Sequence, residues 1–280
     1  MEQSVYRELK PFQARNGSTL YYRYYPAESN HVIILLHGIC EDSKYLKPMA
    51  EFISREHLAH VYTLDLRGYG QYPERRGDVD YIGQIENDLM DLIEFVKHDH
   101  PESTLIMAGH SAGGGTAIRF AGSKYGTHVD AYLLFAPFVH PDAPTTPKSN
   151  PNSRTKVYLS RLVPLILLNK VGVTLFNHWH VLSVNKPKEQ YHGTETLHLS
   201  YRLLMSRIPE KYEDALRALQ QPTLVLIGDK DEDFDHSQYE PLFKRYNRAE
   251  VKIINGADHD GLLEHGDAYA EVKNWFAQLT

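Results

Sequence analysis

Cysteine is nearly absent from this chain, which has one in 280 residues. A single cysteine excludes an intrachain disulfide, so a packed core must hold the fold, and this content suits a reducing compartment. No apolar run reaches the roughly 18 residues that a membrane-spanning helix needs. Residues 1–8 contain no apolar stretch typical of a secretion signal. We therefore expect a soluble, cytoplasmic protein.

The chain also has fewer basic than acidic side chains. The chain has 30 Lys and Arg against 36 Asp and Glu, and its net charge is -6. Because phosphate backbones are bound by clustered Lys and Arg, this balance argues against nucleic acid as a partner. Internal repeats and low-complexity linkers are missing as well. The length fits one large domain with a full core, and we predict a single domain over residues 1–280.

Short apolar runs of strand length recur along the chain. Helical patterns lie between them, and the clearest is 82–96, where Ile85, Leu89 and Leu92 fall on one face. Strands that alternate with helices predict a mostly parallel sheet with helices on both faces, an α/β architecture. The predicted strands are residues 21–25, 32–36, 61–66, 104–108, 131–135, 223–227 and 251–254.

The segment 139–207 breaks this alternation. It is too long for a simple crossover between strands, and unstructured loops of such length are rare. We predict a mainly helical cap, inserted over the carboxyl edge of the sheet. Within it, residues 157–176 are strongly apolar, and Pro164 disfavours one unbroken helix. This apolar surface either packs against the main domain or forms the entrance for an acyl chain, in transient contact with a membrane surface.

Residues 109–113 read Gly-His-Ser-Ala-Gly, which matches the G-x-S-x-G pattern of a nucleophile elbow. An apolar run precedes the pattern, and a helix-like stretch, 114–121, follows it. A sharp turn from strand to helix lifts a serine hydroxyl clear of the sheet, and only small residues fit beside it. The sequence therefore predicts Ser111 as a nucleophile.

A serine hydroxyl needs a histidine to take its proton, and the histidine needs a carboxylate to hold its tautomer. In the fold that carries this elbow, the acid and then the base follow later strands. The acidic loop 229–233 comes directly after strand 223–227, and we choose Asp231 as the acid, with Asp233 as the alternative. His259 lies in a glycine-flanked loop just past the last strand and is the predicted base.

Two backbone amides are expected to stabilise an oxyanion. Ala112 follows the nucleophile at the start of a helix, where free N–H groups favour negative charge. Ile39 lies in the loop after strand 32–36 and is the natural second donor. The ring of His37 is expected to support that loop by hydrogen bonding, and Cys40 is expected to be inert packing.

Two short stretches hold closely spaced metal-ligating residue types: His178-Trp179-His180 and Asp258-His259-Asp260. Neither the pair His178 and His180 nor the pair Asp258 and Asp260 has the spacing of a metal site. We therefore predict no metal and no other cofactor.

Several motifs together resemble one family. They are the His37-Gly38 loop with Glu41, the D-x-R-G-x-G stretch 65–70, Arg76-Gly77, the elbow 109–113, Gly228 with Asp231, and residues 256–259. They are similar to motifs of the α/β-hydrolase fold enzymes, in particular the monoacylglycerol lipases and bacterial lysophospholipases, the serine aminopeptidase-like group. The resemblance covers nearly the whole chain outside the cap, and it implies a triad of Ser111, Asp231 and His259.

The chain departs from this family at two positions. Cys40 replaces the second glycine of the usual H-G-x-G-E loop, and Tyr72 stands where a serine commonly follows the D-x-R-G-x-G stretch. Neither change removes a catalytic group. Both affect the shape of the acyl pocket and therefore leave the substrate open.

The expected activity is hydrolysis of a carboxylic ester through an acyl-serine intermediate. The expected substrate is a small-molecule ester or a single-chain lipid, such as a monoacylglycerol or lysophospholipid. Arg154, Lys156 and Arg161 are either head-group contacts or a solvated face of the cap. Three alternatives stay open: a short-chain carboxylesterase, a serine aminopeptidase, thioesterase or acyltransferase, and a non-catalytic binding protein. The sequence predicts no oligomeric state.

Overall fold

The computed structural model describes residues 6–150 and 153–279. Its centre is an eight-stranded sheet with the order β1-β2-β4-β3-β5-β6-β10-β11. β1 and β2 are antiparallel to their neighbours, and the other six strands run parallel, as predicted. The strands are β1 Lys10–Gln13, β2 Thr19–Tyr25, β3 His31–Leu36, β4 His60–Asp65, β5 Thr104–His110, β6 Ala131–Phe135, β10 Thr223–Gly228 and β11 Glu250–Ile254.

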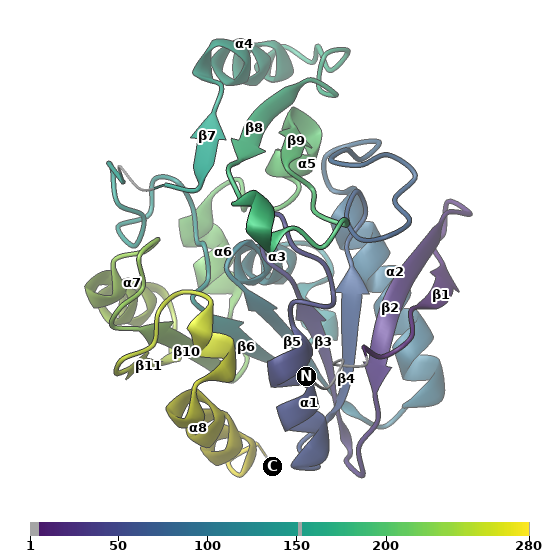
Figure 1. Ribbon diagram of the computed structural model, residues 1–280, viewed down its shortest axis with the longest axis vertical. Coiled ribbons are helices and arrows are strands. Elements are labelled where there is room, and N and C mark those ends of the chain that lie inside the picture. Colours follow the sequence, from purple (N-terminus) through teal and green to yellow (C-terminus); the bar gives the residue numbers. More distant parts are fainter. Residues whose placement is uncertain (1–5, 151–152, 280) are drawn as a thin grey trace.

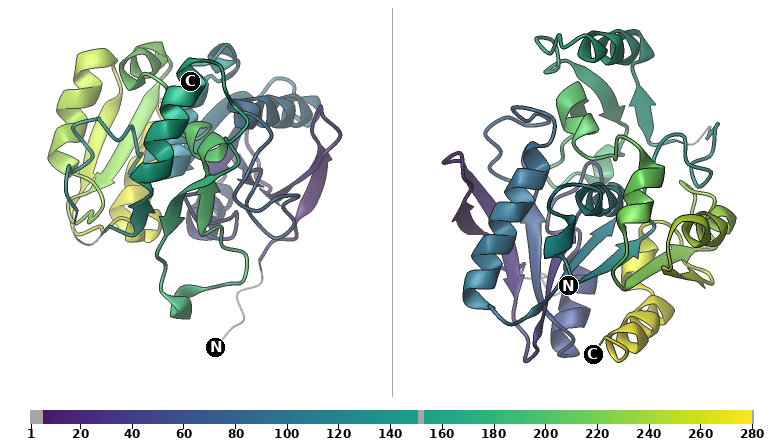
Figure 2. Two further views of the ribbon diagram at one scale, coloured as in Figure 1. Left: turned by 90° about the horizontal axis from the view of Figure 1, so that it is seen from above. Right: turned by 180° about the vertical axis from the view of Figure 1, so that it is seen from behind.

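Helices cover both faces of this sheet (Figures 1 and 2). α1 and α8 pack together on one face, where the rings of Phe52 and Tyr269 stack 4.1 Å apart. α2, α3 and α6 lie on the other face, and Arg119 of α3 pairs with Glu86 of α2 at 2.7 Å. The helices are α1 Lys47–Arg55, α2 Gln84–Asp99, α3 Ala112–Ala121, α6 Tyr212–Ala218, α7 Tyr239–Tyr246 and α8 Gly266–Phe276.

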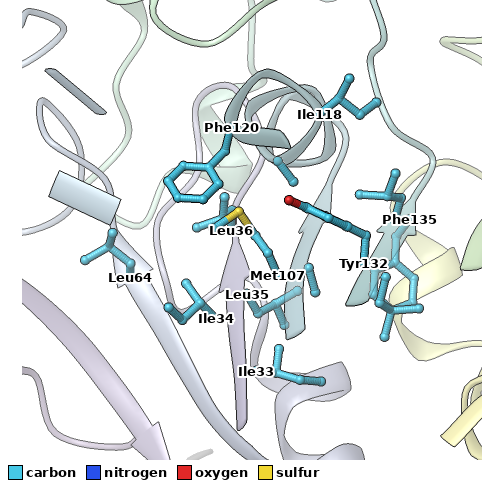
Figure 3. Packing of buried hydrophobic residues seen from close by; sticks show 14 of the residues in the cluster. Ile33, Ile34, Leu35, Leu36, Leu64, Met107, Ile118, Phe120, Tyr132 and Phe135 are labelled. Carbon is cyan, nitrogen blue, oxygen red and sulfur yellow. The ribbon is translucent and has the colours of Figure 1, made fainter. Parts of the chain in front are cut away.

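The core is densest around β3, whose residues 32–36 are fully buried. Figure 3 shows Met107 of β5, Tyr132 of β6 and Phe120 of α3 packed about this strand. Each such side chain contributes about 1.5–3 kcal/mol of hydrophobic stabilisation. The strands are therefore a rigid platform for the loops at their carboxyl ends.

The segment that we predict as the cap, residues 139–207, carries a second sheet as well as helices. Its strands, β7 Thr155–Val157, β8 His180–Val184 and β9 His198–Ser200, are antiparallel, and its α-helices are α4 Leu159–Lys170 and α5 Tyr201–Met205. Figure 1 shows the cap above the carboxyl ends of the main sheet, with α4 at its top. The sequence did not predict these strands, because runs of three to five residues are too short to show a periodicity.

Helix α4 continues through Pro164, so the predicted break at this residue is wrong. Proline has no N–H, and the carbonyl of Ser160, four residues earlier, loses its usual helical partner. Both residues are exposed, so water can satisfy that carbonyl and the helix persists.

Candidate active site

Ser111 lies in the sharp turn between β5 and α3, with φ 55° and ψ -122°. A non-glycine residue in this region is strained by about 1–3 kcal/mol, which the surrounding structure must hold in place. Glycine is required on both sides of this turn, at residues 109 and 113, because a side chain there would collide with the backbone. A Cβ on Gly109 would lie 2.4 Å from the backbone of Gly113, and a Cβ on Gly113 would lie 2.2 Å from the carbonyl oxygen of Leu36. The predicted elbow is therefore present in shape as well as in sequence.

Asp231 and His259 meet at the same edge of the sheet, because the parallel strands β5, β10 and β11 all end there. The Oδ2 atom of Asp231 lies 2.7 Å from Nδ1 of His259, and both side chains are almost completely buried. The Oδ1 atom of Asp231 accepts the backbone N–H groups of Asp233 and Phe234 at 2.9 and 2.8 Å. This carboxylate therefore holds a proton on Nδ1 of His259 and leaves Nε2 free to accept one.

Asp233, the alternative acid, faces the other nitrogen of the same ring. Its Oδ2 atom lies 3.7 Å from Nε2 of His259 and 2.7 Å from a guanidinium nitrogen of Arg154. Arg154 also binds the carboxylate of Asp260 at 2.8 Å. The cap residue Arg154 thus joins the acid loop to the base loop, while its side chain remains 37% exposed.

The His259 loop is anchored to the elbow through His110, the residue before Ser111. Nε2–H of His110 donates to the carbonyl of His259 at 2.9 Å, and the two rings lie 4.7 Å apart. Within residues 6–150 and 153–279, the hydroxyl of Ser111 has no hydrogen-bond partner, so its bond to Nε2 of His259 is not formed. Such catalytic hydrogen bonds often tighten only when a substrate binds.

The groups around His259 predict how kcat/KM depends on pH. Burial alone would lower the pKa of this imidazole, but the hydrogen bond and charge of Asp231, with the charges of Asp233 and Asp260, raise it above its ordinary value of 6.5. A general base must be neutral in the free enzyme. We therefore expect kcat/KM to fall as the pH drops through this raised pKa, with its half-maximal point above pH 6.5 in a profile measured from pH 5 to 9. A half-maximal point below 6.5 would contradict this assignment of the base.

His37 braces the loop that carries Ile39. Its Nδ1–H donates to the carbonyl of Gly38 at 2.8 Å, and its Nε2 accepts the N–H of Leu66 at 3.2 Å. Burial, with the nearby charge of Arg207, lowers the pKa of His37 to about 3, so the ring is neutral. Because C=O and N–H point in opposite directions across a planar trans peptide, holding the Gly38 carbonyl fixes the direction of the Ile39 N–H.

The amide of Ala112 is fixed in the same way. The carbonyl of Ser111 accepts N–H groups of Phe138 at 2.9 Å and Gly115 at 3.2 Å. In the described part of the chain, neither Ile39 N–H nor Ala112 N–H donates to a protein acceptor. The two loops are close, since a Cβ on Gly38 would lie 3.8 Å from that of Ser111. Two oriented and free N–H donors beside a serine are what an oxyanion requires.

One group of side chains in the described residues has the spacing to hold a metal ion: His110, His259 and Asp260. Its atoms are already engaged. The hydroxyl of Tyr45 lies 3.2 Å from Nδ1 of His110 and donates to Asp260 at 2.8 Å, while Arg154 binds the other oxygen of Asp260. The free atom is Nε2 of His259, which a general base needs for itself, and we assign no metal to this site.

The family of this chain follows from its similarity to known proteins. A hydrolase family described as "Serine aminopeptidase, S33" matches residues 27–266. The chain belongs to this family. It is also 25% identical to human monoglyceride lipase over 291 residues, which covers 98% of this chain and 92% of that protein. It is 26% identical to the monoacylglycerol lipase of Mycolicibacterium smegmatis over 200 residues, which covers 71% and 70%.

Solved structures agree on the fold of this S33 member. A soluble variant of the monoglyceride lipase of Saccharomyces cerevisiae, in complex with a substrate analog, matches with a TM-score of 0.74 at 20% identity. The match covers 100% of this chain and 98% of that one. The predicted resemblance and the α/β-hydrolase fold are confirmed. The predicted class of enzyme, a carboxylic ester hydrolase, is likewise confirmed by the family and these relatives.

Proposed function

We propose that this S33 family member hydrolyses monoacylglycerols or lysophospholipids through an acyl intermediate on Ser111. The observation that carries the proposal is the buried pair of Asp231 and His259, together with the elbow of Ser111 and the amides of Ala112 and Ile39, which donate to no acceptor in the described part of the chain. Relatives named monoacylglycerol and monoglyceride lipases support the lipid substrate.

In the proposed reaction, the Ser111 hydroxyl attacks the ester carbonyl while Nε2 of His259 takes its proton. The N–H groups of Ile39 and Ala112 stabilise the oxyanion of the tetrahedral intermediate. His259 then gives the proton to the leaving alcohol, and the acyl group remains on Ser111. Water, with His259 again as the base, releases the fatty acid, while Asp231 stabilises the imidazolium in both steps.

The cap supports a lipid substrate. Leu165 faces inward and is 2% exposed, so part of the apolar stretch packs the cap. A larger set of apolar side chains on and after α4 is exposed to solvent. Helix α4 lies at the top of the molecule in Figure 1. We call this set the cap ridge: Leu159, Val163, Leu167, Val171 and Leu175, each between 49% and 75% exposed.

An apolar ridge at the edge of the cap suits transient contact with a lipid surface. No helix in the described part of the chain is long and apolar enough to cross a membrane. The proposal is therefore peripheral contact through the cap ridge. A cytoplasmic location, which suits the single cysteine, belongs to the same proposal.

The test measures hydrolysis of p-nitrophenyl esters of increasing acyl length, beside a monoacylglycerol and lysophosphatidylcholine, with Ser111→Ala as the control. Turnover that depends on Ser111, rises with acyl length and extends to either lipid would support the proposal. Turnover confined to short esters would instead make the protein a short-chain carboxylesterase.

Placing a charge on the cap ridge should separate lipid from soluble substrates. Leu167, 58% exposed, would contribute about 1.5–3 kcal/mol on entering lipid. We therefore expect Leu167→Asp to lower vesicle binding and kcat/KM for a monoacylglycerol in vesicles by roughly tenfold or more, and to leave acetyl ester hydrolysis unchanged. Ile253→Asp, a matched change at a 50% exposed residue of β11, should alter neither. Equal losses on both substrates for Leu167→Asp would argue against the ridge as a lipid contact.

A further inference from the structure

Arg207, just after α5, is a buried arginine with no acidic partner. Its side chain is 1% exposed, and in residues 6–150 and 153–279 it forms no ion pair. Among the described residues, its Nη1 atom has no hydrogen-bond partner, and neither has the hydroxyl of Tyr69, whose ring lies 5.0 Å from the guanidinium. Burying an unpaired charge lowers the stability of a fold by several kcal/mol, so a buried Arg207 indicates a role other than stabilising the fold.

The two hydrogen bonds that the Arg207 guanidinium forms reach both halves of the proposed oxyanion hole. Nη2 donates to the carbonyl of His37 at 2.7 Å, in the loop that carries Ile39. Nε donates to the hydroxyl of Thr116 at 2.9 Å, and that hydroxyl donates to the carbonyl of Ala112 at 2.8 Å. One side chain thus bridges the loop after β3 to the first turn of α3.

Among the residues that the structure describes, no carboxylate pairs with the charge of Arg207. Guanidinium stays protonated in proteins. His37, next to it, is neutral, and burial raises the pKa of the Tyr69 phenol, which keeps that group neutral too. A tetrahedral intermediate would place a new negative charge between the N–H groups of Ile39 and Ala112, in the two segments that Arg207 joins. In a buried site such a fixed charge acts with little screening.

We propose that Arg207 is a positioning residue of the oxyanion hole, which ties its two halves together and holds a positive charge that the oxyanion balances. This inference rests on the proposed function of Ser111, Ile39 and Ala112. It predicts that Arg207 stabilises the transition state more than the folded protein.

Arg207→Met tests this directly, because methionine keeps a long unbranched chain and removes the charge and both hydrogen bonds. We expect kcat to fall about 100-fold, the lower end of the loss for one oxyanion-hole donor, with little change in KM. The free energy of unfolding in urea should stay unchanged or rise, because an unpaired buried charge is gone. A structural arginine would give the opposite result, lower stability with kcat retained per active site titrated with a fluorophosphonate.

Arg67→Met is the matched control. Arg67 is also buried, at 7% exposure, but it is paired with Asp88 through two contacts of 2.8 Å. Its replacement should lower stability, because Asp88 loses its partner, and should leave kcat per titrated site unchanged. Arg207→Lys should recover part of the kcat lost in Arg207→Met, since it restores the charge and one donor.

Thr116→Val removes the hydrogen bond between Arg207 and Thr116 and leaves the one to His37. It therefore tests the proposal even if Arg207→Met does not fold. Alone it should lower kcat by less than Arg207→Met, and in the Arg207→Met background it should add little. Wild-type kcat in Arg207→Met or in Thr116→Val, or full additivity of the two, would overturn the inference. Ser111→Ala, measured in parallel, separates the two proposals. Turnover by Ser111→Ala would contradict the proposed function. An inactive Ser111→Ala together with an Arg207→Met of wild-type kcat would contradict this inference alone.

Discussion

Ser111→Ala should lower kcat for ester hydrolysis on the order of 10⁶-fold, because no other group at the elbow can form the acyl intermediate. The fold should remain intact, since the change removes a hydroxyl that has no hydrogen-bond partner among the described residues. Alanine also keeps the same Cβ in the strained backbone at φ 55°. The measurement is the rate with a p-nitrophenyl ester, together with labelling by a fluorophosphonate, which should be lost as well.

His259→Ala should cost nearly as much as Ser111→Ala, and the double variant should lose no further activity. The two residues act as a unit, so removing either one stops the same step. Ser237→Ala and His128→Ala, both at exposed residues in short 3-10 helices, are the matched controls and should keep full turnover. Losses that multiply in the double variant would show that the two residues act in separate steps.

The main sheet could be predicted because its strands are distinct in the sequence. Residues 32–36 are apolar without interruption, and the structure buries all five. β1, only Lys10–Gln13, was missed because it is short and mostly exposed, with Phe12 as its one buried residue. Its place depends on pairing with β2, which is a tertiary contact.

The cap was harder to predict for a similar reason. β7, β8 and β9 have few residues each, and their pairing joins segments that are far apart in the chain. The continuity of α4 depends on the exposure of Ser160 and Pro164, which the sequence does not contain. Propensity alone therefore gave the wrong answer at this proline.

The residues of the candidate site also differ in whether the sequence alone can identify them. Ser111, Asp231 and His259 each follow a strand in a local pattern, so the sequence alone identifies them as candidates. Arg207 has no such signal, because its partners Thr116 and His37 are 91 and 170 residues away in the chain. Residues that orient a site through tertiary contacts become visible only when the fold is known.

Asp231→Asn should lower kcat by about 10⁴-fold, because the amide can donate to Nδ1 of His259 and favour the tautomer with its proton on Nε2. That tautomer cannot accept the proton of Ser111. The geometry distinguishes the two candidate acids, since Asp231 contacts Nδ1 at 2.7 Å and Asp233 lies 3.7 Å from Nε2. The pair of asparagine variants therefore compares two carboxylates on opposite sides of one ring.

Asp233→Asn should keep most of the activity, with a loss below roughly tenfold, because the buried contact on Nδ1 remains. Its effect should appear in the pH profile. The charge of Asp233 helps to raise the pKa of His259, so removing it should lower that pKa and move the acid limb of kcat/KM to lower pH. If Asp233→Asn is the variant that loses 10⁴-fold while Asp231→Asn stays active, Asp233 is the acid of the triad, and the ring of His259 must turn to present Nδ1 to Ser111.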